Sequence, residues 1–206
     1  MGKEIRKIAP YGINGGIGAG TEDGELPTSA GNNYAQFVLT LKNLYGKLEI
    51  SDKAVRASEN STGAFVNLLN TEMDGLIKAS AFNFGRMLYG DGSGFLAEIS
   101  ANTVNSVTVN SVTNLIEGMV VDIVSSSGVV GKASIRIKSI DRTNKEVVFT
   151  TSTLTESEFA GYKLCVQGSY NNEITGLGAI FKSTGSLYGL NRASYSWMTP
   201  YMKDIE

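Results

Sequence analysis

The clearest strand pattern in the chain lies at residues 119–149, which read MVVDIVSSSGVVGKASIRIKSIDRTNKEVVF. Apolar side chains alternate here with polar neighbours at a period of two, in the runs Met119/Val121/Ile123, Ala133/Ile135/Ile137 and Val147/Phe149. Turn-forming residues separate the runs at 125–128 and 141–144. Similar alternation recurs at 107–109 and 162–166. These short strands predict a small antiparallel barrel or sandwich, which we place at residues 95–173.

Upstream of this β-rich region, residues 61–89 carry a helical pattern. Apolar residues recur at spacings of three and four, at Phe65, Leu68, Leu69, Met73, Leu76, Ile77, Phe84, Met87 and Leu88. The glycines at 90–94 end the pattern, because glycine is favoured just after a helix. At 1.5 Å per residue, the helix would be about 43 Å long. Gly63, Gly75 and Gly85 disfavour a coiled coil, so the pattern predicts one long helix packed against a sheet.

The remaining segments lack a core of their own. Residues 1–35 contain a glycine-rich run from Gly12 to Gly24 without helical or strand periodicity, which predicts an N-terminal arm. Residues 36–60 place apolar and charged side chains on opposite faces of an extended segment, which predicts a β-hairpin loop without a local partner. Residues 174–206 are rich in loops and aromatic side chains, with no evident terminal helix or strand.

The composition excludes several chemistries. The 206 residues include 0 His, 1 Cys and 3 Pro, with 18 Lys and Arg against 20 Asp and Glu. Without histidine there is no Ser-His-Asp triad, no Cys-His dyad and no imidazole-bound metal. One cysteine excludes an intramolecular disulfide and every multi-cysteine metal site. The chain has no apolar run of membrane-spanning length and no signal-peptide core, and its basic residues form no stripe suited to nucleic acid.

Two glycine-rich segments could suggest ligand binding. The first fails the dinucleotide motif G-x-G-x-x-G, because Gly16 and Gly18 require a glycine where Thr21 stands, and the chain has no P-loop motif. The second, from Tyr89 to Gly94, faintly resembles a cation loop but lacks the acidic ladder of an EF-hand. A flexible arm and two tight turns are the favoured interpretations.

Cys165 and the acidic pair Glu156 and Glu158 are the other candidates. Cys165 lies on the strand face opposite Leu164 and Val166 with no base nearby, so we interpret it as an unreactive thiol. The two glutamates could suggest a glycosidase-like pair, but their polar loop favours a solvated turn. The β-rich region is net acidic and does not interleave aromatic with basic residues, as an oligonucleotide-binding barrel would. We therefore expect no catalytic, cofactor-binding or metal-binding residues.

The order of these segments resembles the major capsid proteins of tailed bacteriophages and prophages, which have the HK97-type shell fold. The resemblance is sharpest at residues 60–94 and 174–197, where the chain reads GLGAIF from Gly176 and YGLNRASYSW from Tyr188. It implies an α+β fold in which a long spine helix packs on a β-sheet, with an extended arm, a β-hairpin loop and a small antiparallel β insertion. The parts would be an arm at 1–35, a hairpin loop at 36–60, a spine helix at 61–94, an insertion at 95–173 and a return segment at 174–206.

The resemblance implies a structural protein and not an enzyme. The subunit would self-assemble through arm and loop contacts into pentamers and hexamers of a shell, with scaffolding or portal proteins as further partners. No membrane and no specific nucleic-acid site are implied. The subunit would reside in the virion, and in the host bacterial cytoplasm before assembly.

Two details of the resemblance bear on the ends and the loop of the chain. Family members continue beyond the tryptophan-containing segment, so the return segment is expected to be truncated. Some members form a Lys–Asn crosslink, for which Lys47 and Lys53 lie in the corresponding segment. The alternative hypothesis is a β-barrel module that binds a ligand or single-stranded nucleic acid.

Overall fold

The computed structural model describes residues 3–57, 62–151 and 154–203. The chain forms two compact units. The first unit joins Met1–Leu41 to Ala179–Glu206, and the second unit is Lys42–Gly178. The chain therefore leaves the first unit after an N-terminal segment and returns to it near its C-terminus.

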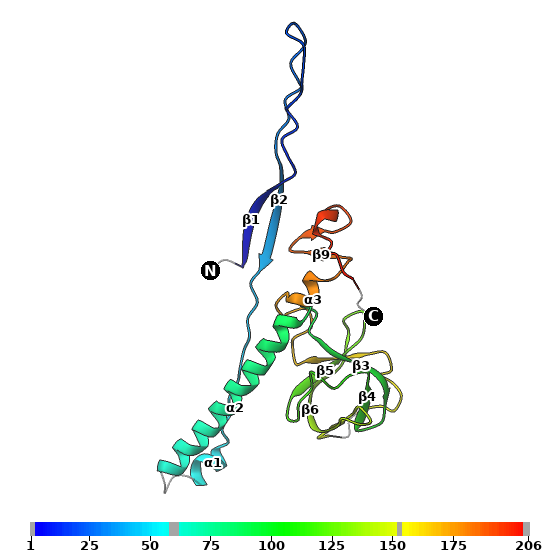
Figure 1. The fold of residues 1–206 in the computed structure, drawn as a ribbon. Coiled ribbons are helices and arrows are strands. Elements are labelled where there is room, and N and C mark those ends of the chain that lie inside the picture. Colours follow the sequence, from blue (N-terminus) through cyan, green and yellow to red (C-terminus); the bar gives the residue numbers. More distant parts are fainter. Residues whose placement is uncertain (1–2, 58–61, 152–153, 204–206) are drawn as a thin grey trace. The chain divides into compact units, whose positions relative to one another are not determined.

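The core of the second unit lies inside a closed antiparallel β-barrel (Figure 1). Its strands are β3 (Phe95–Asn102), β4 (Ser106–Val109), β5 (Val120–Val124), β6 (Val130–Asp141), β7 (Glu146–Phe149) and β8 (Lys163–Val166). They follow the order β3-β4-β7-β6-β5-β8, and β3 pairs with both β4 and β8, which closes the barrel. Ile99, Ile123, Ile137 and Leu164 are among the largest fully buried side chains. The sequence leaves a barrel and a sandwich open, and the pairing of β3 with β8 shows that the strands form a barrel.

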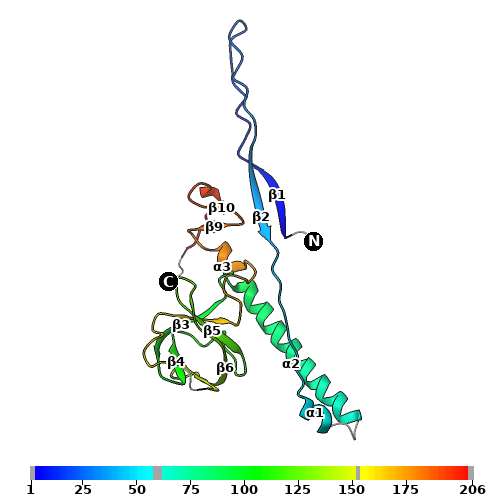
Figure 2. The same cartoon turned by 180° about the vertical axis from the view of Figure 1, so that it is seen from behind.

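Helices α1 and α2 precede the barrel. Helix α1 spans Asp52–Ala57, and α2 spans Thr62–Tyr89, within the range where the apolar spacing predicts a helix. The C-terminal part of α2 approaches the barrel, where Phe82 packs against the barrel core and Met87 is buried. In both views the N-terminal half of α2 extends away from the barrel (Figures 1 and 2). Most of the helix therefore does not lie on a sheet.

The expected α+β fold class of the HK97 type is wrong. Helices make up only 18% of the chain, and the principal structure is one six-stranded sheet without a long spine helix packed along it. The physical reason is the place where apolar side chains are buried. The barrel strands bury theirs inside a closed cylinder. Val66, Met73 and Ile77 of α2 stay exposed instead of being covered by a sheet.

The first unit is built on an antiparallel hairpin. Strand β1 (Glu4–Tyr11) pairs along its full length with β2 (Asn33–Thr40). Residues 12–32, which we call the arm loop, connect the two strands as a pair of long legs that run side by side (Figures 1 and 2). The expected division into an arm at 1–35 and a hairpin at 36–60 is therefore wrong, because the partner of β2 lies upstream of it.

Glycines allow the two legs of the arm loop to approach closely. A Cβ atom at Gly16 would lie 3.2 Å from the backbone nitrogen of Ala30, and one at Gly18 would lie 3.0 Å from Cβ of Pro27. Both distances are shorter than side chains normally tolerate, so larger residues would push the legs apart. The glycine-rich run is thus one leg of a narrow hairpin.

Aromatic contacts join the base of this hairpin to the C-terminal segment. That segment contains α3 (Leu177–Ile180), β9 (Ser186–Leu187), β10 (Leu190–Asn191) and a 3-10 turn at Ser196–Met198. Trp197 stacks on Tyr11 with ring centres 5.5 Å apart, and it meets Phe37 edge-on at 6.3 Å. The N–H group of Val38 donates to the carbonyl of Tyr188 at 2.8 Å. The hairpin base is thus anchored by residues from the other end of the chain.

A buried arginine holds the C-terminal segment together. Arg192 is only 3% exposed. Its Nη2 donates to the carbonyls of Ala179 and Ile180 at 2.9 Å each, while Nη1 and Nε donate to those of Thr184 and Met198 at 3.3 Å each. The guanidinium group therefore gathers four backbone carbonyls around one side chain.

Candidate functional site

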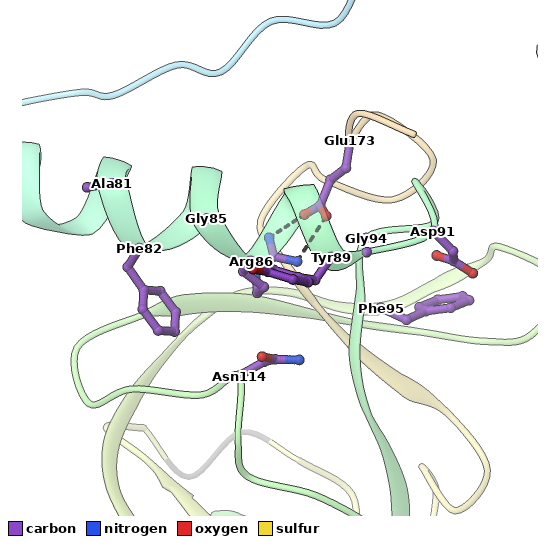
Figure 3. A pocket seen from close by; sticks show the side chains of 11 residues that line it. Ala81, Phe82, Gly85, Arg86, Tyr89, Asp91, Gly94, Phe95, Asn114 and Glu173 are labelled. Atoms are coloured by element: carbon purple, nitrogen blue, oxygen red, sulfur yellow. Dashed lines mark hydrogen bonds and ion pairs between the residues drawn. The ribbon is translucent and has the colours of Figure 1, made fainter. Parts of the chain in front are cut away.

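The C-terminal end of α2 and the barrel form a cleft within the second unit (Figure 3). This α2 cleft has a volume of about 470 Å³ and is lined by Ala81, Phe82, Gly85, Arg86, Tyr89, Gly90, Asp91, Gly94, Phe95, Asn114 and Glu173. Its walls come from the last turns of α2, the turn that follows, the start of β3, the loop before β5 and the segment after β8. The cleft therefore depends on how α2 is joined to the barrel.

A buried ion pair forms one side of the α2 cleft. Nη1 of Arg86 donates to Oε2 of Glu173 at 2.9 Å, and Nη2 donates to Oε1 at 2.5 Å, so the contact is bidentate (Figure 3). The side chains are 5% and 2% exposed. Among the described residues, Nε of Arg86 has no hydrogen-bond partner. The pair therefore links α2 to the segment that follows β8, and its two opposite charges add no net charge to the cleft.

This ion pair is not predictable from the local sequence pattern. Its two residues are 87 positions apart, and nothing in the pattern around Glu173 sets that residue apart from other acidic residues. The one available signal was Arg86 itself, because it lies between Gly85 and Met87 in the apolar end of the helical pattern. A charge in such a place is seldom buried unless it is paired.

Cys165 on β8 is fully buried, and so is its neighbour Leu164. Leu164 belongs to the barrel core, so Cys165 lies on the outer strand face, in register with Asp122 of β5. Burial, and then the charges of Asp122 and Glu173, raise the pKa of Cys165 to about 12. A thiol with this pKa stays protonated at neutral pH and is a poor nucleophile. The geometry therefore agrees with an unreactive thiol, although the outer face is covered as well as the inner one.

The turn after α2 makes its hydrogen bonds within itself. Oδ1 of Asp91 accepts the N–H of Ser93 at 2.9 Å and also the hydroxyl of Ser93. Gly94 has a φ of 80°, and a Cβ atom there would lie 2.5 Å from the carbonyl oxygen of Ser169. In the part of the chain that the structure describes, no group of three or more His, Cys, Asp or Glu side chains could hold a metal ion. The glycines of this turn are thus explained by backbone geometry.

The acidic pair at 156 and 158 lies apart from the α2 cleft. Glu156 and Glu158 are both exposed, as a solvated turn requires. Within the cleft, Arg86 and Glu173 bind each other and Asp91 binds Ser93. Among the described residues, the cleft therefore places no nucleophile beside a general base.

The arm loop exposes large apolar side chains. Ile13, Ile17 and Leu26 are 87%, 90% and 91% exposed. Such values are far above those of a side chain that packs against its own chain. The arm loop is therefore a candidate interface with another molecule.

Helix α2 carries a second exposed apolar surface. It consists of Val66, Met73, Ile77, Phe84 and Leu88, which are 44–61% exposed. Successive members are seven or four positions apart, so at 3.6 residues per turn they lie within about 60° of one another around the helix axis. We call this surface the α2 stripe. The α2 stripe runs along most of the length of α2, so it is longer than a contact with one side chain requires.

The lysines considered for a crosslink lie before and within α1. Lys47 forms an exposed ion pair with Glu49 at 3.0 Å. The side chain of Lys53 lies outside those that the structure describes.

Comparison with known proteins adds no relative. Among residues 3–57, 62–151 and 154–203, no helix is both long and apolar enough to cross a membrane. No protein-family model, no curated protein and no solved structure matches the chain.

Proposed function

We propose that the chain is a structural subunit of a phage or prophage capsid shell, which self-assembles through contacts of its arm loop. The observation that carries this proposal is the exposure of Ile13, Ile17 and Leu26 on a long, narrow hairpin. Burial of such a side chain contributes about 1.5–3 kcal/mol. In a shell, these side chains would be buried against a neighbouring subunit, and this burial would contribute that free energy.

The glycine content of the arm loop supports the same role. Fixing the backbone of one residue costs about 1–2 kcal/mol, and glycine loses more conformational freedom than other residues. Residues 12–32 bury little apolar surface within their own chain. A contact with another subunit would offset the cost of ordering them.

The α2 stripe supports an assembly larger than a dimer. A closed dimer needs only one self-complementary surface, whereas rings and shells need at least two different contacts per subunit. The arm loop and the α2 stripe lie in different units of the chain and are both apolar and exposed. The order of segments in the sequence adds support for a capsid role, which we propose without the fold class that the resemblance implied.

A barrel that binds single-stranded nucleic acid is the second candidate. Although the basic residues form no stripe over the chain as a whole, five of them lie in 130–146, at Lys132, Arg136, Lys138, Arg142 and Lys145. Nucleic-acid barrels also present aromatic side chains on which bases stack. Phe149 and Phe159 are buried instead, so we favour the structural role.

The proposal is tested by the state of association of the full chain. We would replace residues 12–32 with Asn-Gly, which suits a two-residue turn between antiparallel strands. Sedimentation velocity and negative-stain electron microscopy should show concentration-dependent oligomers or particles for the natural chain and species no larger than a dimer for this variant, which keeps the α2 stripe. Far-UV circular dichroism would verify that the variant retains its β-structure.

Two outcomes would overturn the proposal. One is a natural chain that stays monomeric at every concentration reached. The other is a variant without the arm loop that assembles as readily as the natural chain.

A further inference from the structure

The basic residues of the barrel are concentrated on one hairpin. Residues 130–146 comprise β6, the turn that follows it and the first residue of β7. They contain five basic and two acidic residues. The rest of the span 90–176 carries one base, Lys163, and seven acids. Clustering of this kind creates a local positive field on a barrel that is otherwise acidic.

The alternation of β6 turns part of this charge outward. Ile135 and Ile137 are buried in the barrel core, whereas Arg136 and Lys138 are exposed. Arg136 lies between two buried isoleucines and therefore points to the outer face of the barrel, and Lys138 is exposed at the register shift between Ile137 and Ser139. We call Arg136 and Lys138 the β6 basic strip.

Exposed apolar residues begin the same strand. Val129 and Val130 are 64% and 50% exposed. They follow the turn in which Gly128 N–H donates to the carbonyl of Ser125 at 3.0 Å. Strand β6 therefore offers both apolar contact and positive charge to solvent.

The tip of the arm loop has the complementary composition. No Lys or Arg occurs between Lys7 and Lys42, and the acids in that interval are Glu22, Asp23 and Glu25. These acids are exposed on a tight turn, in which Gly24 N–H donates to the carbonyl of Thr21 at 3.1 Å. Leu26 and Ile17 are exposed on the adjoining parts of the two legs. The tip therefore carries negative charge beside apolar side chains.

We propose that the acidic tip of the arm loop of one copy binds the β6 basic strip of a second copy. Glu22, Asp23 and Glu25 face Arg136 and Lys138 in this contact, while Ile17, five residues before Glu22 on one leg, covers Val129 and Val130, which lie six or seven residues before Arg136 at the start of β6. This inference rests on the proposed self-assembly and names the surface that receives the arm.

The two kinds of contact have different roles. Exposed ion pairs are individually weak and are screened by salt, so the charges orient the tip and make the association salt-dependent. The apolar side chains contribute affinity that salt does not screen. Self-association should therefore weaken as salt rises from low to moderate concentration, without disappearing.

The test exchanges the charges of the two surfaces in the full chain. One variant is Glu22→Lys/Glu25→Lys, a second is Arg136→Glu/Lys138→Glu, and a third combines all four substitutions. Each of the first two should weaken self-association at low salt by about tenfold, as expected for several exposed pairs lost together. The combined variant should recover most of this loss, because opposite charges face each other again.

The matched control is Glu156→Lys/Glu158→Lys. It makes the same change of charge on another pair of exposed glutamates, so it should leave self-association within about twofold of the natural chain. If the Glu22→Lys/Glu25→Lys variant self-associates as strongly as this control, or if the combined variant shows no recovery of self-association, the inference is wrong. A natural chain that does not associate at all would instead overturn the proposed function.

Disulfide trapping gives a readout that does not depend on charge reversal. Asp23→Cys and Lys138→Cys would be prepared as separate full-length variants and mixed under mild oxidation. Because Cys165 is fully buried, it contributes little background. Disulfide dimers should form faster in the mixture than in either variant alone, and equal rates would contradict the contact.

If the Arg136→Glu/Lys138→Glu variant loses binding to a single-stranded oligonucleotide but assembles normally, the strip serves nucleic acid and the inference also fails.

Discussion

The ion pair between Arg86 and Glu173 allows a sharp test of how α2 is held to the barrel. Its side chains are 5% and 2% exposed, so both charges are removed from water when the chain folds. The substitution Glu173→Leu leaves the guanidinium group buried without its partner. Breaking a buried pair in this way costs about 3–5 kcal/mol, whereas replacing both charges with apolar groups is often nearly neutral. We therefore expect Glu173→Leu to be strongly destabilising and Arg86→Met/Glu173→Leu to recover most of the loss.

Urea denaturation followed by far-UV circular dichroism measures the effect. Tryptophan fluorescence would not serve, because the single tryptophan, Trp197, belongs to the first unit. For a domain of this size, a loss of 3–5 kcal/mol corresponds to a fall in melting temperature of roughly 6–20 °C. The control is Glu117→Leu, which breaks the exposed contact of Glu117 with Arg142 at 3.9 Å and should cost under about 1 kcal/mol.

Two results would refute this reasoning. A loss below about 1 kcal/mol for Glu173→Leu would mean that the charges are not desolvated as their burial indicates. A double variant as unstable as the sum of the two single variants would mean that the residues act independently.

Three further predictions concern the packing of each unit. Cys165 should resist alkylation at pH 8 in the native state and react after denaturation, because burial raises its pKa to about 12. For the same reason, the folded state should lose stability as the pH rises from 9.0 toward 12, since the thiol of the unfolded chain ionises first. Arg192→Lys should destabilise the first unit by about 2–3 kcal/mol, seen by tryptophan fluorescence, because lysine cannot reach the same four carbonyls. Gly94→Ala should lower the melting temperature by more than Gly161→Ala does, because both residues have a positive φ but only Gly94 lies against another backbone segment; equal effects would show that the contact is unimportant.

Local patterns in the sequence were informative where a short segment decides its own structure. The spacing of apolar residues over 61–89, ended by Gly90, lies at the position of α2. The period-two runs correspond to β4 through β8. They did not reveal β3, because Leu96, Ala97 and Ile99 are all buried and show no regular alternation. The buried charges were also missed, since their partners are distant in the sequence.

The hairpin shows why register is harder to predict than strand propensity. Residues 37–41 carry a strand-like alternation, and the extended residues that follow them in the sequence predict a partner downstream. The structure pairs β2 with β1 across the arm loop instead. The preference of a strand for one partner depends on contacts far along the chain, here those of Phe37 and Tyr11 with Trp197.

The amino-acid sequence by itself excluded histidine chemistry and an intramolecular disulfide, located the long helix and most strands, and revealed a surplus of glycine at 12–24. Tertiary structure decided that the strands close into a barrel, that most of α2 lies outside it and that the glycines form one leg of a narrow hairpin. The physical reason is that periodicity records which face of a segment is apolar. Which other surface covers that face depends on how the strands close on one another and on contacts between residues that are far apart in the sequence.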